Sequence, residues 1–446
     1  MASQKKFAVQ LFAEFAIHFD KTEVADHVWH HAQRAVIDWY ASLYPGLETE
    51  SVLVLERTLS EELDHGLARL GNGRASSVRA AALFNGTAAH AAEVDDSFRE
   101  AMYHPGAATI AAALAAAQAV GADGKQFLRA VILGYEVSTR IGMVMGRAHY
   151  RYWHNTGTMG SFGAAAAAAN LYGLNEVEFA NALALAATFT AGLQQAFKTE
   201  PMAKPLHAGR AAEAGIFAAQ SAKQGMLSSL NVLEGELGLG NAMSKDVDWS
   251  TVASTLGSDF HITRLTFKNH IGCGHTFPSI DGALFLKQLH GFNAEDIEKV
   301  ELGVYRPTLD IAGHTNPQTA DEAKFSINYM VASALVFGSV RLSAFEPDRL
   351  GDPLTRDLIS RIHAQLDPEV DAGFPERRAA RVKINLKDGR SFEHLQPDRK
   401  GDPELPLSDK DLEGKLMELA GPVIGKDQAA ELLQRIWNLT KSENLP

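Results

Sequence analysis

The chain has 446 residues, 46% of them hydrophobic and 22% charged, so it can bury a large core and falls in the ordinary range for globular proteins. Its formal net charge of −12 argues against a general nucleic-acid or membrane-surface role, because such roles favour a basic face. The single cysteine, Cys273, excludes an intrachain disulfide and an iron–sulfur cluster held by several cysteines of this chain.

The same features predict a cytoplasmic protein. One cysteine fits a reducing compartment. The first seven residues lack the apolar core of a signal peptide, and no uninterrupted run of about 18 apolar residues indicates a membrane span. We therefore expect no nucleic-acid partner and no membrane partner.

The first part of the chain is predicted to be a compact, mainly helical domain. Apolar residues recur at helical spacing between about residues 7 and 43, and another helix is expected over 50–70. Residues 71–74 are predicted to form a turn. Further helices, mostly rich in alanine, are expected over 77–93, 107–118, 134–146, 175–192 and 211–222.

Three stretches in this domain place polar residues just before a small-residue helix. In the first, an acidic segment ending at Ser97 precedes His104, and Pro105 suits the first turn of a helix. His104 then lies at a helix N-terminus, where the helix dipole favours anions. The alternative is that Asp95, Asp96 and Ser97 cap the helix and that His104 is only a loop residue.

The second stretch runs from His154 to Gly163 and is followed by six alanines. Its glycines suggest a loop that brings a histidine and hydroxyl groups close to a ligand. The alternative is a helix N-terminus with a capping loop inside an all-helical core.

In the third stretch, Pro201 and Pro205 bracket Lys204, which predicts a stiff loop because proline fixes φ. A lysine held in this way is unusual for a solvated surface residue. Since small residues let helices approach closely, the three helix starts could converge on one place.

Past about residue 262 the pattern changes to a smaller α+β domain. A polar, glycine-rich link, 268–275, leads to a helix from Pro278 to about His290. Alternating apolar residues predict strands, Lys387-Asp388-Gly389-Arg390 predicts a hairpin turn, and two long segments predict helices. The expected strands are 298–305, 381–386 and 391–395, and the expected helices are 321–337 and 352–366. Beyond them, Ser408 can cap a helix that is stopped by Gly421-Pro422, and a last helix is expected over 427–438.

The sequence contains none of the familiar motifs of phosphate loops, zinc proteases, thiol pairs or serine hydrolases. What remains is a set of proton-transfer and anion-binding side chains. Histidine suits proton transfer near neutral pH, and fixed cations stabilise the charge that develops when a proton is removed next to a carboxylate. A small polycarboxylate substrate is therefore expected. The side chains are His104, His154, Lys204, Lys268, His275, Tyr329, Glu93, Asp95 and Asp96.

Taken together, these residues resemble the MmgE/PrpD family in order and spacing over nearly the whole chain. The matching pieces are Val94-Asp95-Asp96-Ser97 with His104-Pro105-Gly106, His154 with Gly160-Ser161-Phe162-Gly163, Lys204-Pro205-Leu206-His207-Ala208-Gly209, Lys268 with His275, and Ala323-Lys324-Phe325-Ser326-Ile327 with Tyr329.

The resemblance implies a mainly α fold, with a large all-helical domain over 1–264, completed by C-terminal helices in 399–446, and a smaller α+β lid domain over 265–398. It also implies a homodimer and no metal or organic cofactor. By position it implies a cleft between the domains, with catalytic roles for His104, His154, Lys204 and His275, and substrate-binding roles for Glu93, Asp96, Ser97, Lys268 and Tyr329.

This sequence departs from the family pattern near the expected pocket. Glu93 stands where relatives often have aspartate, and the segment from Asp96 to His104 is longer by about one residue than in the decarboxylases. His104-Pro105-Gly106 replaces the His-Pro-Ser that is typical of decarboxylases and methylcitrate dehydratases. The reaction cannot therefore be copied from one relative.

The hypothesis from the sequence is a cofactor-independent lyase that acts on a small di- or tricarboxylate, with 2-methylcitrate dehydratase-like elimination of water placed first. His154 or Lys204 would be the base, His104 or His275 the acid, and Lys268 a carboxylate ligand. The alternatives are a cis-aconitate-type decarboxylase, an epimerase of an iminodisuccinate-like dicarboxylate, and a non-catalytic polycarboxylate-binding paralogue. Cys273 is interpreted as a packed residue and His207 as a possible backbone donor.

Overall fold

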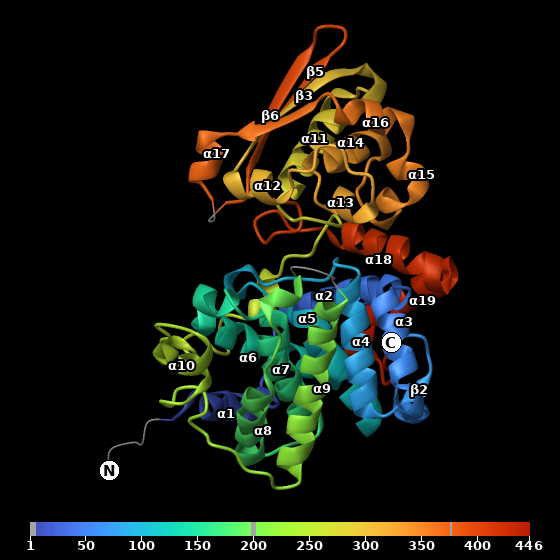
Figure 1. Ribbon diagram of the computed structural model, residues 1–446. Coiled ribbons are helices and arrows are strands. Elements are labelled where there is room, and N and C mark those ends of the chain that lie inside the picture. The colour runs from blue at the N-terminus through green and yellow to red at the C-terminus, as the bar shows by residue number, and fades with distance from the viewer. Residues whose placement is uncertain (1–5, 198–201, 375–376) are drawn as a thin grey trace. The chain divides into compact units, whose positions relative to one another are not determined.

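The computed structural model describes residues 6–197, 202–374 and 377–446 (Figure 1). The chain divides into two compact units. The first runs up to Phe267 and takes in Ser408–Pro446, and the second is Lys268–Leu407. The sequence placed the boundaries at 264/265 and 398/399, so residues 399–407 group with the second unit here rather than with the C-terminal helices.

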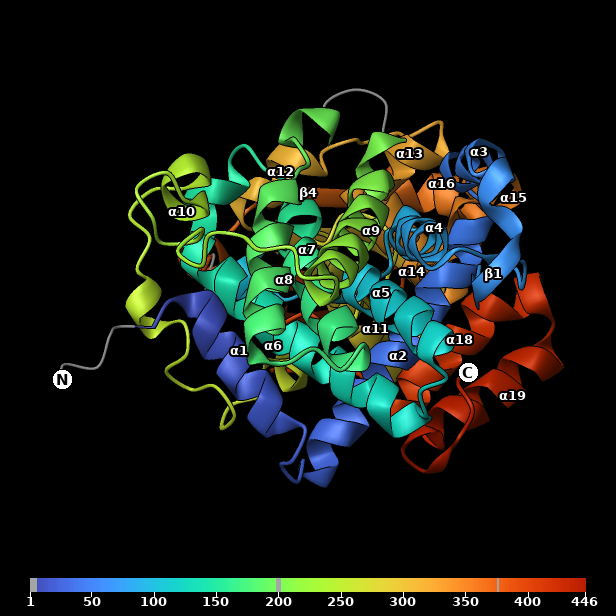
Figure 2. The ribbon, with the colours of Figure 1, turned by 90° about the horizontal axis from the view of Figure 1, so that it is seen from below.

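The first unit is built mainly from helices, as the predicted fold class requires, and it also contains one two-stranded sheet. Its core is α7, which contacts α5, α6, α8 and α9, and Figures 1 and 2 show α7 and α9 lying side by side. No helix in the described ranges is long and apolar enough to cross a membrane. The helices are α1 (Ala8–Phe19), α2 (Asp26–Leu47), α3 (Glu50–Thr58), α4 (Val78–Ala91), α5 (Pro105–Val120), α6 (Gly124–Tyr150), α7 (Asn155–Leu171), α8 (Glu176–Phe189), α9 (Ala203–Lys223), α10 (Leu239–Met243), α18 (Asp409–Ile424) and α19 (Lys426–Trp437).

The glycine-rich stretch after His154 is helical, so the loop predicted there is wrong. His154 is the N-cap residue of α7, and the helix already includes Gly157, Gly160 and Gly163. A Cβ atom at these positions would lie 2.4 Å from the Ala191 carbonyl oxygen, 2.8 Å from Ala108 Cβ and 2.4 Å from Thr109 Oγ1, respectively. The glycines therefore allow close helix packing rather than a turn.

The predicted loop around Lys204 is also wrong where the structure describes it. Lys204 and Pro205 lie in the first turn of α9, where proline is tolerated because the first helical N–H groups have no intrahelical partner. Pro201, the other proline of the predicted bracket, lies outside the described residues.

The helix predicted over 50–70 ends early. After α3 the chain forms strand β1 (Leu63–Arg69), which pairs antiparallel with β2 (Ala75–Ser76) around the predicted turn at 71–74.

The second unit contains a four-stranded sheet in the order β4-β3-β5-β6. Strand β3 (Ile297–Val304) pairs antiparallel with β5 (Ala380–Leu386), and β5 forms the predicted hairpin with β6 (Ser391–Gln396). Helix α11 contacts β5 and β6, and α14 contacts α11. The helices of this unit are α11 (Phe277–His290), α12 (Arg306–Ile311), α13 (Ala320–Lys324), α14 (Ile327–Phe337), α15 (Pro347–Leu350), α16 (Pro353–Ile359) and α17 (Pro368–Ala372).

Two predicted helices of this unit are each divided. The segment 352–366 forms α16 and then strand β4 (Ile362–Leu366), which pairs parallel with β3. The segment 321–337 forms α13 and α14, because the Ser326 hydroxyl accepts a hydrogen bond from the Tyr329 N–H and caps a new helix.

For α18, the first C-terminal helix, the predicted start is correct and the predicted end is wrong. Ser408 caps α18 through the Asp411 N–H, as expected. The helix passes through Gly421-Pro422 to Ile424, however, and it packs against α2 and α19. Tertiary packing here outweighs the local preference of glycine and proline to end a helix.

Candidate active site

Four histidine rings form a continuous row inside the first unit. His90 lies in the last turn of α4, His104 is the N-cap of α5, His154 is the N-cap of α7 and His207 lies in α9. The ring of His90 is 4.9 Å from that of His104 and 5.4 Å from that of His154, and His154 is 5.4 Å from His207, measured between centroids. We call these four residues the histidine row.

Hydrogen bonds between helix starts hold part of this row in place. The His104 N–H donates to Thr156 Oγ1 at 3.3 Å, which joins the first turns of α5 and α7. The Asn155 side-chain amide donates to the Ala101 carbonyl oxygen at 2.7 Å, which joins the start of α7 to the turn before α5. The predicted convergence of helix starts is therefore present in this unit.

The loop after α4 supplies a carboxylate to two of the histidines. Asp95 Oδ2 lies 2.7 Å from His90 Nδ1 and 3.6 Å from His104 Nδ1. His104 Nδ1 also donates to the Asp96 carbonyl oxygen at 2.6 Å. Because a carbonyl oxygen only accepts, His104 carries a hydrogen on Nδ1, and Nε2 is the atom left to exchange a proton.

His90, Asp95 and His104 can also be considered as metal ligands, since one ligand atom from each lies within 4.8 Å of the others. Two imidazoles and a carboxylate are a donor set that divalent metals accept. In this arrangement, however, Nδ1 of His104 donates to a carbonyl oxygen and Asp95 accepts from His90. Hydrogen bonds within the protein therefore already involve Nδ1 of both histidines and one oxygen of Asp95.

Lys204 lies beside the histidine row and forms an ion pair with Glu93. Burial is the largest influence on the pKa of Lys204 and lowers it, but Glu93, followed by Asp95, raises it. The net pKa is raised, so the ammonium stays charged at neutral pH. Glu93 has a φ of 60°, an uncommon conformation for a residue other than glycine.

Whereas the pKa of Lys204 is raised, that of His154 is lowered. Its side chain is 3% exposed. Burial, followed by the nearby His90 and Lys204, holds the pKa of His154 well below the ordinary histidine value. A neutral imidazole therefore lies in the same cluster as a charged ammonium.

Asp96, predicted to bind substrate, has both carboxyl oxygens in use within the protein. Oδ1 accepts from the Gly106 N–H at 3.0 Å and Oδ2 accepts from the Tyr135 hydroxyl at 2.6 Å. Burial, and then the Asp38 carboxylate, raise the pKa of Asp96 to about 8. Asp96 therefore holds the first turn of α5. Asp95, its neighbour, is the acid that contacts the histidine row.

Ser97, the other predicted member of this segment, is half-buried and pairs with Thr266 through two backbone hydrogen bonds of 2.9 and 2.8 Å. Lys268 follows Thr266 by two residues and is half-buried.

The remaining predicted residues belong to the second unit. His275 is half-buried, and its Nδ1 lies 2.9 Å from the Tyr305 hydroxyl. Burial, together with Arg378 and Arg399, lowers the pKa of His275 to about 4. Tyr329 is fully buried and donates its hydroxyl to the Ala344 carbonyl oxygen. The Tyr329 hydroxyl is thus used inside the unit, and we leave it out of the proposed site.

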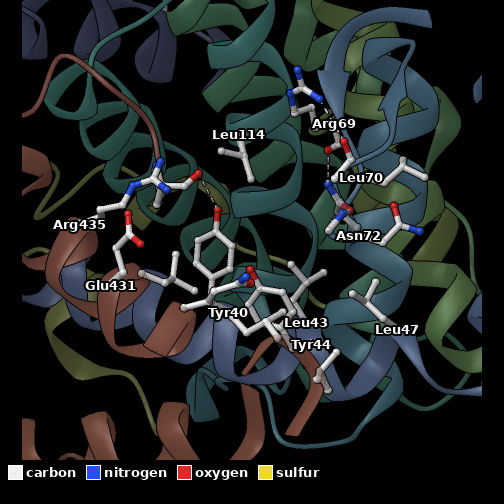
Figure 3. A pocket seen from close by; sticks show the side chains of 18 of the residues that line it. Tyr40, Leu43, Tyr44, Leu47, Arg69, Leu70, Asn72, Leu114, Glu431 and Arg435 are labelled. Atoms are coloured by element: carbon white, nitrogen blue, oxygen red, sulfur yellow. Dashed lines mark hydrogen bonds between the residues drawn. The ribbon is translucent and has the colours of Figure 1, made fainter. Parts of the chain in front are cut away.

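The first unit contains two cavities whose walls include none of the nine predicted site residues. The first, of about 660 Å³, is lined by Tyr40 and Arg435 on one side and by Arg69 and Asn72 on the other (Figure 3). The second, of about 750 Å³, reaches the histidine row, because His207 is part of its wall.

Sequence reasoning missed His90 and His207 as site residues. His207 lies three residues after Lys204, so the two side chains share a face of α9. That spacing becomes a signal only when the segment is read as a helix, and the two prolines favoured a loop. His90 falls inside the helix expected over 77–93, and its contact with Asp95 depends on the loop after α4.

Models of one protein family match both units of the chain. The model of the MmgE/PrpD N-terminal domain matches residues 10–252, and that of the MmgE/PrpD C-terminal domain matches residues 270–439. A cis-aconitate decarboxylase-like protein of Aspergillus oryzae is 29% identical over 83% of this chain and 80% of its own. Human cis-aconitate decarboxylase is 28% identical over 82% and 77%, respectively. A 2-methylcitrate dehydratase of Escherichia coli is 30% identical over 27% of each chain.

Proposed function

The chain belongs to the MmgE/PrpD family, and we propose that it is a lyase that acts on a small di- or tricarboxylate by proton transfer at a carbon next to a carboxylate. The observation that carries this proposal is geometric: the ring of the buried His154 is 5.4 Å from that of His207, which lies three residues along α9 from Lys204. The lowered pKa of His154 and the raised pKa of Lys204 support it. A neutral imidazole can take a proton, and a nearby cation can stabilise the charge that this leaves on the substrate.

The pKa directions support a division of roles that the sequence left open. Lys204 stays charged, which suits binding of a substrate carboxylate better than removal of a proton. We therefore assign the base to His154 and a carboxylate contact to Lys204. Glu93 acts through Lys204, by keeping it charged and fixing its position.

The acid is assigned to His104. Its Nδ1 hydrogen is held by the Asp96 carbonyl oxygen, so Nε2 is the atom that can deliver a proton. The Asp95 carboxylate, 3.6 Å from Nδ1, can stabilise the positive charge of the protonated ring. His275 suits this role less well, because a pKa of about 4 keeps it neutral at pH 7. Lys268 remains a proposed ligand of a second carboxylate.

Two lyase reactions remain as candidates, and they use the acid differently. Loss of water needs a proton on the departing hydroxyl. In that reaction His154 would remove a proton from carbon. Loss of carbon dioxide removes no proton from carbon: a carbon–carbon bond breaks, its electron pair ends on a carbon, and that carbon takes a proton from the acid. Loss of carbon dioxide is the leading candidate, because a cis-aconitate decarboxylase and a decarboxylase-like protein match more than four fifths of the chain. The dehydration that the sequence placed first is supported by a match of 129 residues.

Proton NMR of the purified protein in deuterated water tests the proposal. The compounds are cis-aconitate, citrate, 2-methylcitrate and iminodisuccinate, each incubated with and without a metal chelator. We expect one tricarboxylate to lose carbon dioxide or water at the same rate in both buffers. Turnover that stops with chelator and returns with a divalent metal would contradict cofactor independence. Binding of every compound without turnover or deuterium exchange would contradict catalysis.

A further inference from the structure

His207 is in direct hydrogen-bond contact with the residue assigned as the base. The two Nδ1 atoms of His154 and His207 are 3.1 Å apart. Gly192 lies against both rings, since a Cβ at this position would lie 3.1 Å from His207 Nδ1 and 3.6 Å from His154 Cβ. The Gly192 carbonyl oxygen also accepts from the His154 N–H at 2.8 Å. The backbone therefore leaves room for this pair of rings and helps to fix it.

A hydrogen bond between two Nδ1 atoms requires that one ring carries the hydrogen and the other accepts it. If His154 donates, its Nε2 keeps a lone pair and can act as a base. If His207 donates, the neutral His154 carries its hydrogen on Nε2 and cannot accept a proton there. The partner of Nδ1 thus decides whether Nε2 can do the chemistry.

We propose that His207 is a positioning residue that holds His154 in the tautomer with the hydrogen on Nδ1, which places on Nε2 the lone pair that takes a proton from the substrate. The inference rests on the proposed function in its water-elimination form, in which His154 is the base that removes a proton from carbon. It gives a role to the histidine of the Lys204-Pro205-Leu206-His207 segment, which the sequence treated as a possible backbone donor.

The surroundings of the pair support a hydrogen bond in which His154 donates and His207 accepts. His154 is 3% exposed, whereas His207 is half-buried and forms part of the wall of the cavity of about 750 Å³. Water can therefore reach His207 more readily than His154, and an accepting His207 can place its own hydrogen on Nε2. The charged residues that line this cavity are Arg79, Arg210 and Glu213. On the inner side, the groups that act on His207 are His90 and Lys204.

Substitutions at His207 separate positioning from simple packing. His207→Phe keeps a ring but removes the acceptor, and we expect kcat to fall by about 10- to 100-fold with KM changed by no more than about threefold. His207→Asn can place an amide oxygen near the position of Nδ1, and it should keep most of kcat. His27→Phe, at an exposed histidine, is the control and should leave both constants unchanged.

Nitrogen-15 NMR of histidine-labelled protein tests the tautomer without any substrate. The His154 signals are assigned by their loss in His154→Gln. At pH 8 we expect the wild-type His154 to have a hydrogen on Nδ1 and an unprotonated Nε2, and His207→Phe to shift it to a mixture of tautomers. A hydrogen on Nε2 in the wild type, or an unchanged tautomer in His207→Phe, would overturn the proposal. Because this readout needs no turnover, it stays informative even if the compounds tested for activity are the wrong ones.

Discussion

Lys204, in the first turn of α9, forms an ion pair with Glu93, which lies in the loop after α4 with a φ of 60°. The pair links two segments that are 111 residues apart in the sequence. It also opposes the effect of burial on the ammonium, because the carboxylate raises the pKa of Lys204 while desolvation lowers it.

The Glu93→Gln change should therefore lower the pKa of Lys204. If a charged Lys204 binds the substrate, the high-pH limb of kcat/KM should move to lower pH, because the Glu93 carboxylate no longer raises the pKa of the ammonium. The measurement is kcat/KM between pH 7 and about 11, because the pKa of Lys204 is raised above the ordinary lysine value. Glu236→Gln, at an exposed position, is the matched control. An unshifted limb in Glu93→Gln would argue against a role for the charge of Lys204.

Asp96 predicts a pH dependence of stability. Its pKa in the folded protein is about 8, whereas an unperturbed aspartate titrates near pH 4. Between these values the folded state binds more protons than the unfolded state, so the free energy of unfolding should fall as the pH rises from about 4 to about 8. One group contributes a slope of up to about 1.4 kcal/mol per pH unit.

Asp96→Asn should remove this part of the slope, because the amide keeps an acceptor for the Gly106 N–H and offers a donor to the Tyr135 oxygen. Urea unfolding at pH 5, 6.5 and 8 compares the two proteins. Glu136, whose pKa is raised to about 7 by burial, contributes with the same sign to both and cancels in the comparison. Parallel curves for the two proteins would contradict the assignment.

Gly106 is required by its contacts with Asp96 and Tyr135. A Cβ at this position would lie 2.7 Å from the Tyr135 hydroxyl and 3.0 Å from both Asp96 oxygens. Gly106→Ala should therefore destabilise the fold by about 1–3 kcal/mol, the usual cost of overpacking. Since Tyr135→Phe removes the nearest clashing atom, the double variant should lose less than the sum of the two single changes. Additive losses in thermal unfolding would show that the clash is relieved elsewhere.

The same contacts give a physical reading of one departure from the family pattern. The serine that the pattern places at this position would need space that the Asp96–Tyr135 pair occupies here. The absence of a side chain at Gly106 therefore leaves room for the hydrogen bond between Tyr135 and Asp96.

The sequence predicts that Tyr329 binds substrate, whereas the structure gives its hydroxyl a partner within the protein. Its hydroxyl donates to the Ala344 carbonyl oxygen inside the second unit, and its side chain is fully buried. Tyr329→Phe should lower the free energy of unfolding by about 1 kcal/mol through loss of this hydrogen bond, and it should leave KM within about twofold. A large rise in KM with unchanged stability would instead support the direct substrate contact that the sequence suggested.

Local signals in the sequence predicted the elements whose ends are set by one or two side chains. Pro105 and Pro278 mark helix starts, Ser408 caps α18, and the turn at 387–390 joins β5 to β6. Each of these signals acts within a few residues, so neighbouring sequence is enough to find it.

Elements that depend on distant packing could not be predicted in the same way. The glycines of α7 are helical because α5 and the segment after α8 approach them closely, and glycine alone suggested a loop. Strand β4 exists because β3 offers an edge for parallel pairing. The pattern of 352–366 by itself fitted a helix.

In the candidate site, too, local sequence signals predicted some residues, whereas contacts between distant segments could not be predicted. His104, His154 and Lys204 could be found because each lies at a helix start with a recognisable local pattern. The partners of these residues could not be found, because the contacts join residues far apart in the chain. His154 and His207 are separated by 53 residues, and Asp96 and Tyr135 by 39.

The most direct test of the central claim is the turnover of His154→Ala plus Lys204→Ala in the proton NMR assay, on the compound that the wild type converts. The control is His27→Ala plus Lys410→Ala, a pair of exposed residues of the same types in the same unit. If the base and the carboxylate ligand lie where we propose, the first variant should lose turnover by at least about 100-fold while the control keeps the wild-type rate. Full turnover by the first variant would contradict the proposed site.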